Sequence, residues 1–253
     1  MSDWLWIAGM IAVESVLQAQ SREMQVIYTA LDRFDGRISR LRRLAGERGV
    51  PIEARSEEEL SGLAGSASHG GVVAQVGPRW MQPLDALIVG HAPVVVMLDG
   101  VEDPFNFGQA VRSVYAAGID GLVVRPRNWL AVGTAVRASA GATEFMPTAE
   151  VESPEAAAEA LRPRGFRVAV ADEDGQPMDK VDITGPLLLV VGGEKRGVTR
   201  SFQRAADLRV RIPYGRPFAH ALGTTGAATA LAFEVLRQRG GGVEQWGSGS
   251  VGQ

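Results

Sequence analysis

Three loops of this 253-residue chain carry residue types that could do chemistry, and each follows a run of apolar residues. The first loop holds Asn106 and, nearly two helical turns later, Arg112. The second places Gly192 and Gly193 directly before Glu194, and the third reads IPYGRPFAHALGTTGAA. The fork of an arginine suits phosphate recognition, and paired glycines let a ligand approach the backbone. These residues therefore mark three candidate parts of a binding site.

Each loop also has an ordinary structural interpretation. Asp103 and Asn106 could cap a helix, Arg112 could be a surface cation, and Glu194 could belong to a solvated turn. The stretch GGEKRG lacks the glycine spacing of a P-loop. Because Asn106 and Arg112 are nearly two helical turns apart, we expect both on similar sides of one helix. The small residues of the third loop allow either close helix packing or a tight pocket.

The elements that must position these loops alternate regularly after Pro93. Apolar runs predict strands, and amphipathic stretches between them predict helices. This alternation is typical of βαβ units in an α/β fold with a parallel sheet. Ligands bind at the carboxyl ends of such strands, where the three loops lie. The expected strands are 94–98, 121–124, 144–151, 166–172, 187–193 and 208–213, and the expected helices are 107–118, 130–141, 153–165, 199–206 and 224–239.

The first part of the chain predicts a separate small α/β unit. Helical patterns at 10–19, 38–49 and 56–60 alternate with strand patterns at 24–30, 51–54 and 70–78. The basic helix carries Arg37, Arg40 and Arg43, which could contact phosphates of a nucleic acid or form a solvated face. We therefore expect a small α/β unit at 1–78, a linker at 79–92, a larger α/β domain at 93–240 and a disordered tail at 241–253.

The composition narrows the class of protein. The chain has no cysteine and three scattered histidines, so no disulfide or metal site is expected. No apolar run reaches the roughly 18 residues of a membrane helix, and the start lacks a basic signal-peptide region. A formal net charge of −3 opposes a uniformly basic nucleic-acid binder but leaves local patches open. We expect a cytoplasmic protein with no metal and no membrane partner.

Taken in order, NFGQAVR, VVGGEKRGV, RIPYG and ALGTTGAATALAFEVL resemble the three motifs of the TrmH-like (SpoU) branch of the SPOUT methyltransferases. SHGGVVAQV resembles the segment that joins that family's small RNA-binding domain to its catalytic domain. The resemblance implies a parallel-sheet domain with a C-terminal trefoil knot, which binds S-adenosylmethionine in a homodimer. It also implies methylation of a ribose 2′-hydroxyl in ribosomal RNA, with transfer RNA as the alternative.

The resemblance also implies roles for individual residues. Arg112 would hold a phosphate and ease formation of an alkoxide, with Asn106 and Glu194 orienting the ribose or Arg112. The residues expected to bind the cofactor are Gly192, Gly193, Ile212, Pro213, Leu222 and Thr225.

The third motif departs from the family pattern. The usual Ser-Leu-Asn appears as Ala221, Leu222 and Gly223, so two polar side chains are missing. An alternative hypothesis is therefore a catalytically impaired protein that still binds RNA or cofactor. A further alternative is an ordinary nucleotide-dependent α/β enzyme that exists as a monomer.

Overall fold

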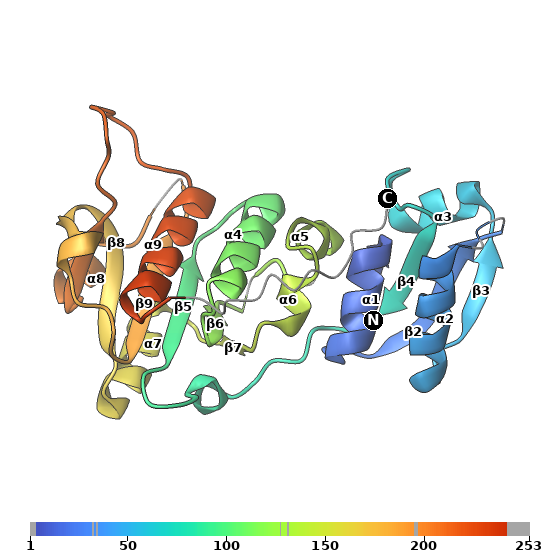
Figure 1. Cartoon of the computed structure of the whole chain (residues 1–253), viewed down its shortest axis with the longest axis horizontal. Helices are drawn as coiled ribbons and strands as arrows, with labels where there is room; N and C mark the ends of the chain where they lie inside the picture. Colours follow the sequence, from blue (N-terminus) through green and yellow to red (C-terminus); the bar gives the residue numbers. More distant parts are fainter. Residues whose placement is uncertain are drawn as a thin grey trace.

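Two β-sheets organise the chain, as Figure 1 shows for a computed structural model of the protein. The structure describes residues 4–31, 33, 35–126, 128–130, 132–194 and 197–241. Most of the predicted tail, from 242 onward, lies outside the described residues. No helix among these residues has the length and apolar character needed to span a membrane.

The small unit contains a four-stranded mixed sheet of order β1-β4-β2-β3. Helices α1 and α2 pack on one face around Ile27 and Leu41, and α3 covers part of the other face through Leu60. The four-residue strand β1 is too short to give a clear alternation and was not predicted. The elements are β1 Leu5–Ala8, α1 Met10–Ala19, β2 Met24–Ala30, α2 Gly36–Glu47, β3 Ile52–Arg55, α3 Glu57–Ala64 and β4 Val72–Val76.

The large unit contains a six-stranded sheet of order β10-β8-β9-β5-β6-β7, in which every paired strand is parallel. The predicted α/β class with a parallel sheet is confirmed. The elements are η1 Leu84–Leu87, β5 Val94–Asp99, α4 Pro104–Ala116, β6 Gly121–Val124, α5 Gly133–Ala138, α6 Ala142–Phe145, β7 Thr148–Glu150, α7 Pro154–Leu161, η2 Arg162–Arg164, β8 Arg167–Pro177, η3 Met178–Lys180, β9 Leu187–Gly192, α8 Arg200–Ala205, β10 Leu208–Arg211 and α9 Thr224–Gln238.

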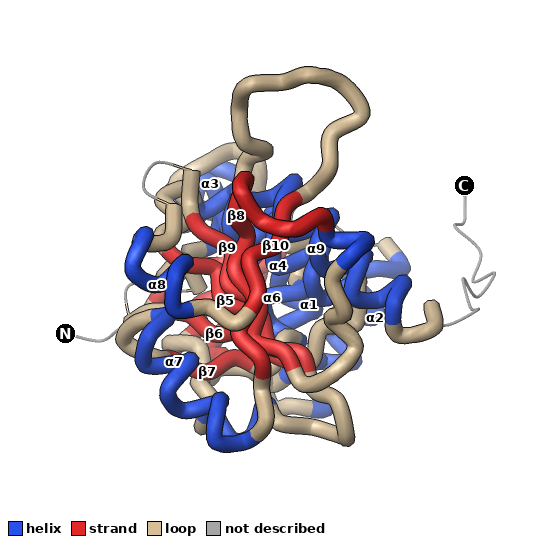
Figure 2. The backbone as a smooth tube through the Cα atoms, turned by 90° about the vertical axis from the view of Figure 1, so that its left-hand side faces the viewer, coloured by secondary structure: helices blue, strands red, loops and turns tan. Residues whose placement is uncertain are grey.

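Helices on both faces bury the central strands β5 and β9. Helices α4 and α9 cover one face through residues such as Val111 and Leu231, and α7 and α8 cover the other through Leu161 and Phe202. Figure 2 shows this layered arrangement in a view turned by 90°. Burial on both faces explains why these strands read as continuous apolar runs. The carboxyl ends of β5 and β9 therefore meet at one edge.

Two predicted elements differ in the structure. The helix expected over 130–141 is limited to α5, and α6 follows as a separate short helix, because the chain turns at Gly141 with a left-handed φ of 83°. A Cβ atom at Gly141 would also collide with the Ser15 hydroxyl of the small unit. The strand expected over 144–151 begins only at Thr148, since Glu144 and Phe145 belong to α6. Glu144 thereby faces the small unit.

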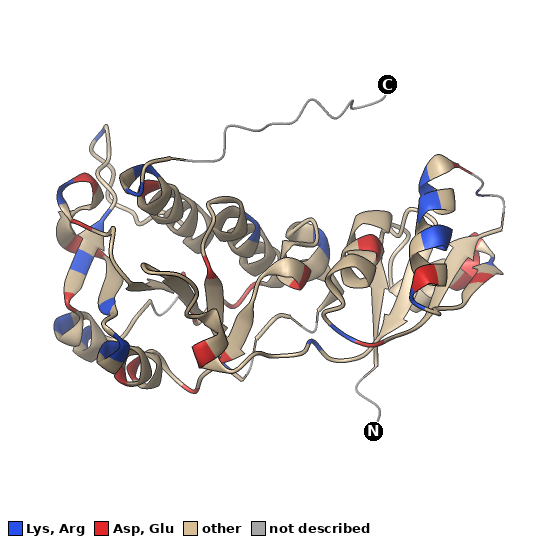
Figure 3. Cartoon of the chain, turned by 60° about the horizontal axis from the view of Figure 1, so that its bottom comes forward, with Lys and Arg blue, Asp and Glu red and all other residues tan. Residues whose placement is uncertain are grey.

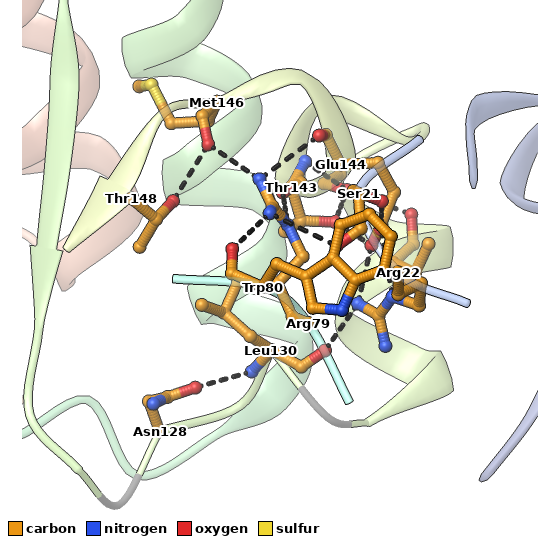
Figure 4. A network of polar contacts seen from close by, with 12 residues as sticks. Ser21, Arg22, Arg79, Trp80, Asn128, Leu130, Thr143, Glu144, Met146 and Thr148 are labelled. Atoms are coloured by element: carbon orange, nitrogen blue, oxygen red, sulfur yellow. Dashed lines mark hydrogen bonds and ion pairs between the residues drawn. The ribbon is translucent and has the colours of Figure 1, made fainter. Parts of the chain in front are cut away.

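A buried polar network joins the two units (Figure 4). Arg22 follows α1, and its Nη2 lies 2.8 Å from Oε1 of Glu144, with both side chains inaccessible to solvent. The Ser21 hydroxyl also donates to Glu144. Arg79, from the connecting segment, donates to backbone carbonyls of both units, and burial lowers the pKa of its guanidinium. The small unit is therefore fixed to α6 by a buried charge pair and by hydrogen bonds to backbone carbonyls of both units.

Candidate active site

The first two loops meet where β5 and β9 end side by side. Asp99 and Gly192 are register partners, and the N–H of Gly193 donates to the carbonyl of Asp99 at 2.7 Å. A Cβ atom on Gly193 would collide with the carbonyl of Gly100. One on Gly192 would lie 2.7 Å from the backbone nitrogen of Val198. The glycine pair is thus required by the close approach of two backbones, in addition to any ligand.

Asn106 and Glu194 are brought together at this edge. Nδ2 of Asn106 donates to Oε1 of Glu194 at 3.0 Å. The cap of α4 is Asp103, whose carboxylate accepts from the backbone N–H of Asn106 at 2.7 Å. The Asn106 side chain is therefore free of the capping role and can serve the site.

The start of α9 completes the arrangement. The hydroxyl of Thr225 donates to the carbonyl of Asn106 at 3.1 Å, and that of Thr224 donates to the carbonyl of Gly192 at 3.0 Å. The third loop thus contacts both other loops. Thr224 was not singled out from the sequence, where nothing distinguishes it from its neighbour.

A cavity of about 910 Å³ opens beside these contacts. Four of the six predicted cofactor residues line it: Gly192, Gly193, Ile212 and Leu222. Pro213 and Thr225 are not among its lining residues. Bare glycine backbone, apolar side chains and nearby carboxylates such as Glu194 suit an amphiphilic ligand with positive charge, and the volume lies in the range of small-molecule sites. The residues present therefore fit S-adenosylmethionine, whose sulfonium and ammonium groups are cationic.

Arg112 lies elsewhere on α4. Its side chain is exposed and does not line the cavity, whereas Asn106 is half-buried. Six helical positions turn a side chain through about 600°, which leaves the two residues about 120° apart. The expectation that they share a side of the helix is therefore wrong. Among the described residues, Arg112 makes no hydrogen bond or ion pair. Within one subunit, therefore, no such contact links Arg112 to Glu194, whose hydrogen-bond donor is Asn106.

The three predicted RNA-binding arginines lie on α2 outside its buried face, and Figure 3 marks the positions of basic residues on the ribbon of the chain. Arg40 lies 3.7 Å from Glu14, and Arg43 lies 3.2 Å from Glu47. Arg37 is exposed. They project from the small unit, opposite the buried face of α2 that carries Ile38.

Two aspartates near the site have shifted pKa values. Burial raises the pKa of Asp99, against the opposing charge of Arg125 at 2.6 Å. A hydrogen bond from Arg209 lowers the pKa of Asp172, and Nε of Arg209 lies 2.6 Å from its Oδ2. Asp172 lines the cavity, and its ion pair connects β8 with β10. The pair was missed because its members are far apart in sequence.

Comparisons with known proteins identify the family. The sequence model of the SpoU rRNA Methylase family matches residues 93–222, and that for RNA 2′-O ribose methyltransferase substrate binding matches residues 6–80. The chain is 31% identical over 246 residues to the 23S rRNA (guanosine-2′-O-)-methyltransferase RlmB of Pseudomonas aeruginosa, covering 94% of this chain and 98% of that protein. The enzyme of the same name from Pseudomonas syringae pv. tomato is 33% identical with the same coverage.

Solved structures share the fold. The SpoU methyltransferase AviRb from Streptomyces viridochromogenes superposes with a TM-score of 0.79 at 26% identity, covering 93% of this chain and 90% of that one. Its complex with the cofactor AdoMet gives a TM-score of 0.80 at 24% identity, with 94% and 91% covered. The resemblance seen in the sequence is confirmed. The chain belongs to the SpoU rRNA methylase family, and is thus an RNA 2′-O-methyltransferase that uses S-adenosylmethionine.

Proposed function

We propose that this enzyme methylates the ribose of a guanosine in 23S ribosomal RNA, in the cytoplasm, as a homodimer. The names of the RlmB relatives, which align along nearly the whole chain, support this substrate. The observation that carries the proposal is the hydrogen bond between Asn106 and Glu194 beside a cavity that Glu194 and the glycine pair line. The RlmB relatives, which align along nearly the whole chain, favour ribosomal over transfer RNA as the substrate.

The cavity residues would hold the cofactor. When bound, S-adenosylmethionine supplies a methyl group already activated on its sulfonium. Gly192 and Gly193 would offer backbone groups, and Ile212 and Leu222 apolar contact. Thr225 would act through Asn106, whose carbonyl it binds, and Pro213 would direct the loop that follows β10.

The protein's main task is to position a ribose hydroxyl and to ease its deprotonation. Arg112 would bind a phosphate of the RNA and stabilise the developing alkoxide. A guanidinium stays protonated, so electrostatic positioning suits it better than proton abstraction. Asn106 and Glu194 would orient the ribose or Arg112 through their shared hydrogen bond.

In a homodimer, Arg112 of one subunit would lie at the active site of the other subunit. Its face of α4 also exposes Phe105 and Tyr115, which are 53% and 42% accessible, and the adjoining helix α9 exposes Phe233 at 44%. An exposed apolar patch of this kind favours a protein interface. Arg112 stands within the patch, and we infer that it reaches the cavity of the partner subunit.

The knot and the domain division belong to the same proposal. The chain leaves β10 at the sheet edge and returns past β8 to begin α9 beside Gly192, the crossing expected of a trefoil knot. We infer that 1–78 grips RNA, 79–92 is a linker, and 93–240 carries the chemistry.

The altered third motif does not oppose activity. A Cβ atom on Gly223 would lie 3.2 Å from Oε1 of Glu194, so the carboxylate fills the space of the missing side chain. No finding supports the catalytically impaired alternative.

Tritium transfer from labelled S-adenosylmethionine to rRNA tests the proposal, with RNA taken from a strain that lacks the enzyme. We expect one labelled guanosine in 23S rRNA, and loss of labelling by Arg112→Ala with unchanged cofactor affinity. Absence of transfer by the wild-type enzyme would contradict the function. Full turnover by Arg112→Ala would contradict only the assigned role.

A further inference from the structure

A cluster of exposed aromatic rings stands on the loop between β10 and α9. This loop projects from the body of the catalytic domain in Figures 1 and 2. The ring centroids of Tyr214 and Phe218 lie 6.2 Å apart, and those of Phe218 and His220 lie 5.4 Å apart, edge to face. Phe218 is 61% accessible to solvent. An exposed phenylalanine that packs against other aromatic rings is typical of a surface that binds another molecule.

The loop is held in shape by its own hydrogen bonds. The Tyr214 hydroxyl donates to the carbonyl of His220 at 3.3 Å and accepts from the N–H of Leu222 at 3.0 Å. These bonds join the outgoing and returning parts of the loop. Phe218 is therefore presented in a prearranged position, which lowers the entropy lost on binding.

The charge of the segment suits an anionic polymer. Residues 208–233 contain arginines and one histidine but no aspartate or glutamate. Arg209 is paired with Asp172, whereas Arg211 and Arg216 have no ion pair within the part of the chain that the structure describes. Unpaired arginines beside aromatic rings are the combination that binds single-stranded nucleic acid.

The rings also border the cavity. Tyr214, Arg216 and Phe218 line it together with Gly192 and Gly193, which lie at the sheet edge. A nucleotide whose ribose reaches the sheet edge therefore has these rings and this arginine within the same cavity.

We propose that the base of the target nucleotide stacks on Phe218 while Arg216 binds a neighbouring phosphate. The inference rests on the proposed function and adds a recognition site to it. The shared chemistry is a nucleobase against an aromatic ring, and the adenine of the cofactor is the other possible source. The RNA base fits better because Phe218 is 61% exposed to solvent, whereas Gly193, a predicted cofactor residue that lines the same cavity, is buried at the sheet edge.

The test measures KM for 23S rRNA in methyl transfer and, separately, the Kd for S-adenosylmethionine without RNA by calorimetry. Phe218→Ala should raise the KM by roughly 5- to 150-fold, the range for loss of one stacked base, and leave the cofactor Kd unchanged. Phe218→Trp should retain the wild-type KM, and Phe218→Leu should not. Val89→Ala is the control, since Val89 is equally exposed at 61% but lies in the linker.

The outcomes separate the two proposals. An unchanged KM in Phe218→Ala, with active wild-type enzyme, overturns the stacking site alone. A cofactor Kd that weakens as much as the KM assigns the ring to adenine and also overturns it. If the wild-type enzyme transfers no methyl group, the proposed function fails, and the Kd for 23S rRNA of the same variants then decides whether Phe218 binds RNA.

Discussion

The side-chain amide of Asn106 donates a 3.0 Å hydrogen bond to the carboxylate of Glu194, 88 positions further along the chain. This contact joins the start of α4 to the loop after β9. It brings together two residues that the sequence marked separately. Because the acceptor is charged, the bond is stronger than one between neutral groups.

We predict that Glu194→Ala lowers kcat by about 10- to 150-fold, as expected for loss of a charged hydrogen bond that acts in the transition state. Glu194→Gln keeps an oxygen for Asn106 and should retain more activity. Single-turnover methyl transfer measures both variants, with Glu58→Gln in the exposed first turn of α3 as the control. Equal rates for Glu194→Ala and wild type would remove the pair from the mechanism.

The sequence predicted the fold better than the site. Strands such as β5 and β9 are buried on both faces, and their apolar runs are local signals that a single chain displays. The two units and the order of their main elements follow from the same kind of signal. Division of α5 from α6 escaped prediction because it depends on packing of Gly141 against Ser15, which belongs to the other unit.

The site depends on distant contacts that periodicity cannot reveal. Asn106, Glu194 and the glycines were marked by residue type and by resemblance, but their meeting depends on strand order. The Asp172–Arg209 and Arg22–Glu144 pairs carried no local signal. The position of Arg112 was misjudged because its spacing from Asn106 falls short of two full helical turns.

A mixture of two variants with impaired activity tests whether Arg112 serves the partner subunit. If the site is shared, a dimer of one Arg112→Ala chain and one Glu194→Ala chain keeps one intact site. Random exchange then restores about a quarter of the wild-type activity, because half of the dimers are mixed and each has one working site. Methyl transfer before and after subunit exchange measures this. If each site lies within one chain, mixing restores no activity.

Breaking the buried ion pair between the units should be strongly destabilising. Glu144→Gln leaves Arg22 buried without its counter-charge, and we expect a loss of about 3–5 kcal/mol in the free energy of unfolding. Denaturant unfolding measures the loss. Glu47→Gln, which breaks an exposed pair with Arg43, should cost less than about 1 kcal/mol. Similar small losses for both variants would show that the network does not hold the units together.

The Asp172–Arg209 pair should make stability depend on pH in the acid range. Arg209 lowers the folded-state pKa of Asp172 below its unfolded value of about 3.9. The pair therefore stabilises the fold above that value, and the stabilisation is lost as pH falls through the lowered pKa.

Arg209→Gln should accordingly be less stable than wild type at pH 7, with a difference that shrinks below about pH 4. Urea unfolding at pH 7 and pH 3 measures it. Lys180→Gln is the control, since its ammonium is exposed beside Asp179. If the difference in free energy of unfolding between Arg209→Gln and wild type stayed the same at pH 7 and pH 3, the ionised form of Asp172 would not stabilise the fold through Arg209.

If the arginines of α2 contact RNA phosphates, they should contribute to the salt dependence of the affinity for RNA. Each phosphate contact contributes about 0.7 to 0.9 to the slope of log affinity against log salt. Arg37→Gln and Arg43→Gln together should therefore lower that slope by about 1.4 to 1.8 for 23S rRNA. Filter binding across a salt series measures the slope. Arg164→Gln is the matched control, because it removes an exposed arginine of η2 that lies outside the small unit and is paired with Asp85. An unchanged slope in the double variant, together with unchanged affinity, would show that Arg37 and Arg43 form a solvated face and that RNA binds elsewhere on the small unit.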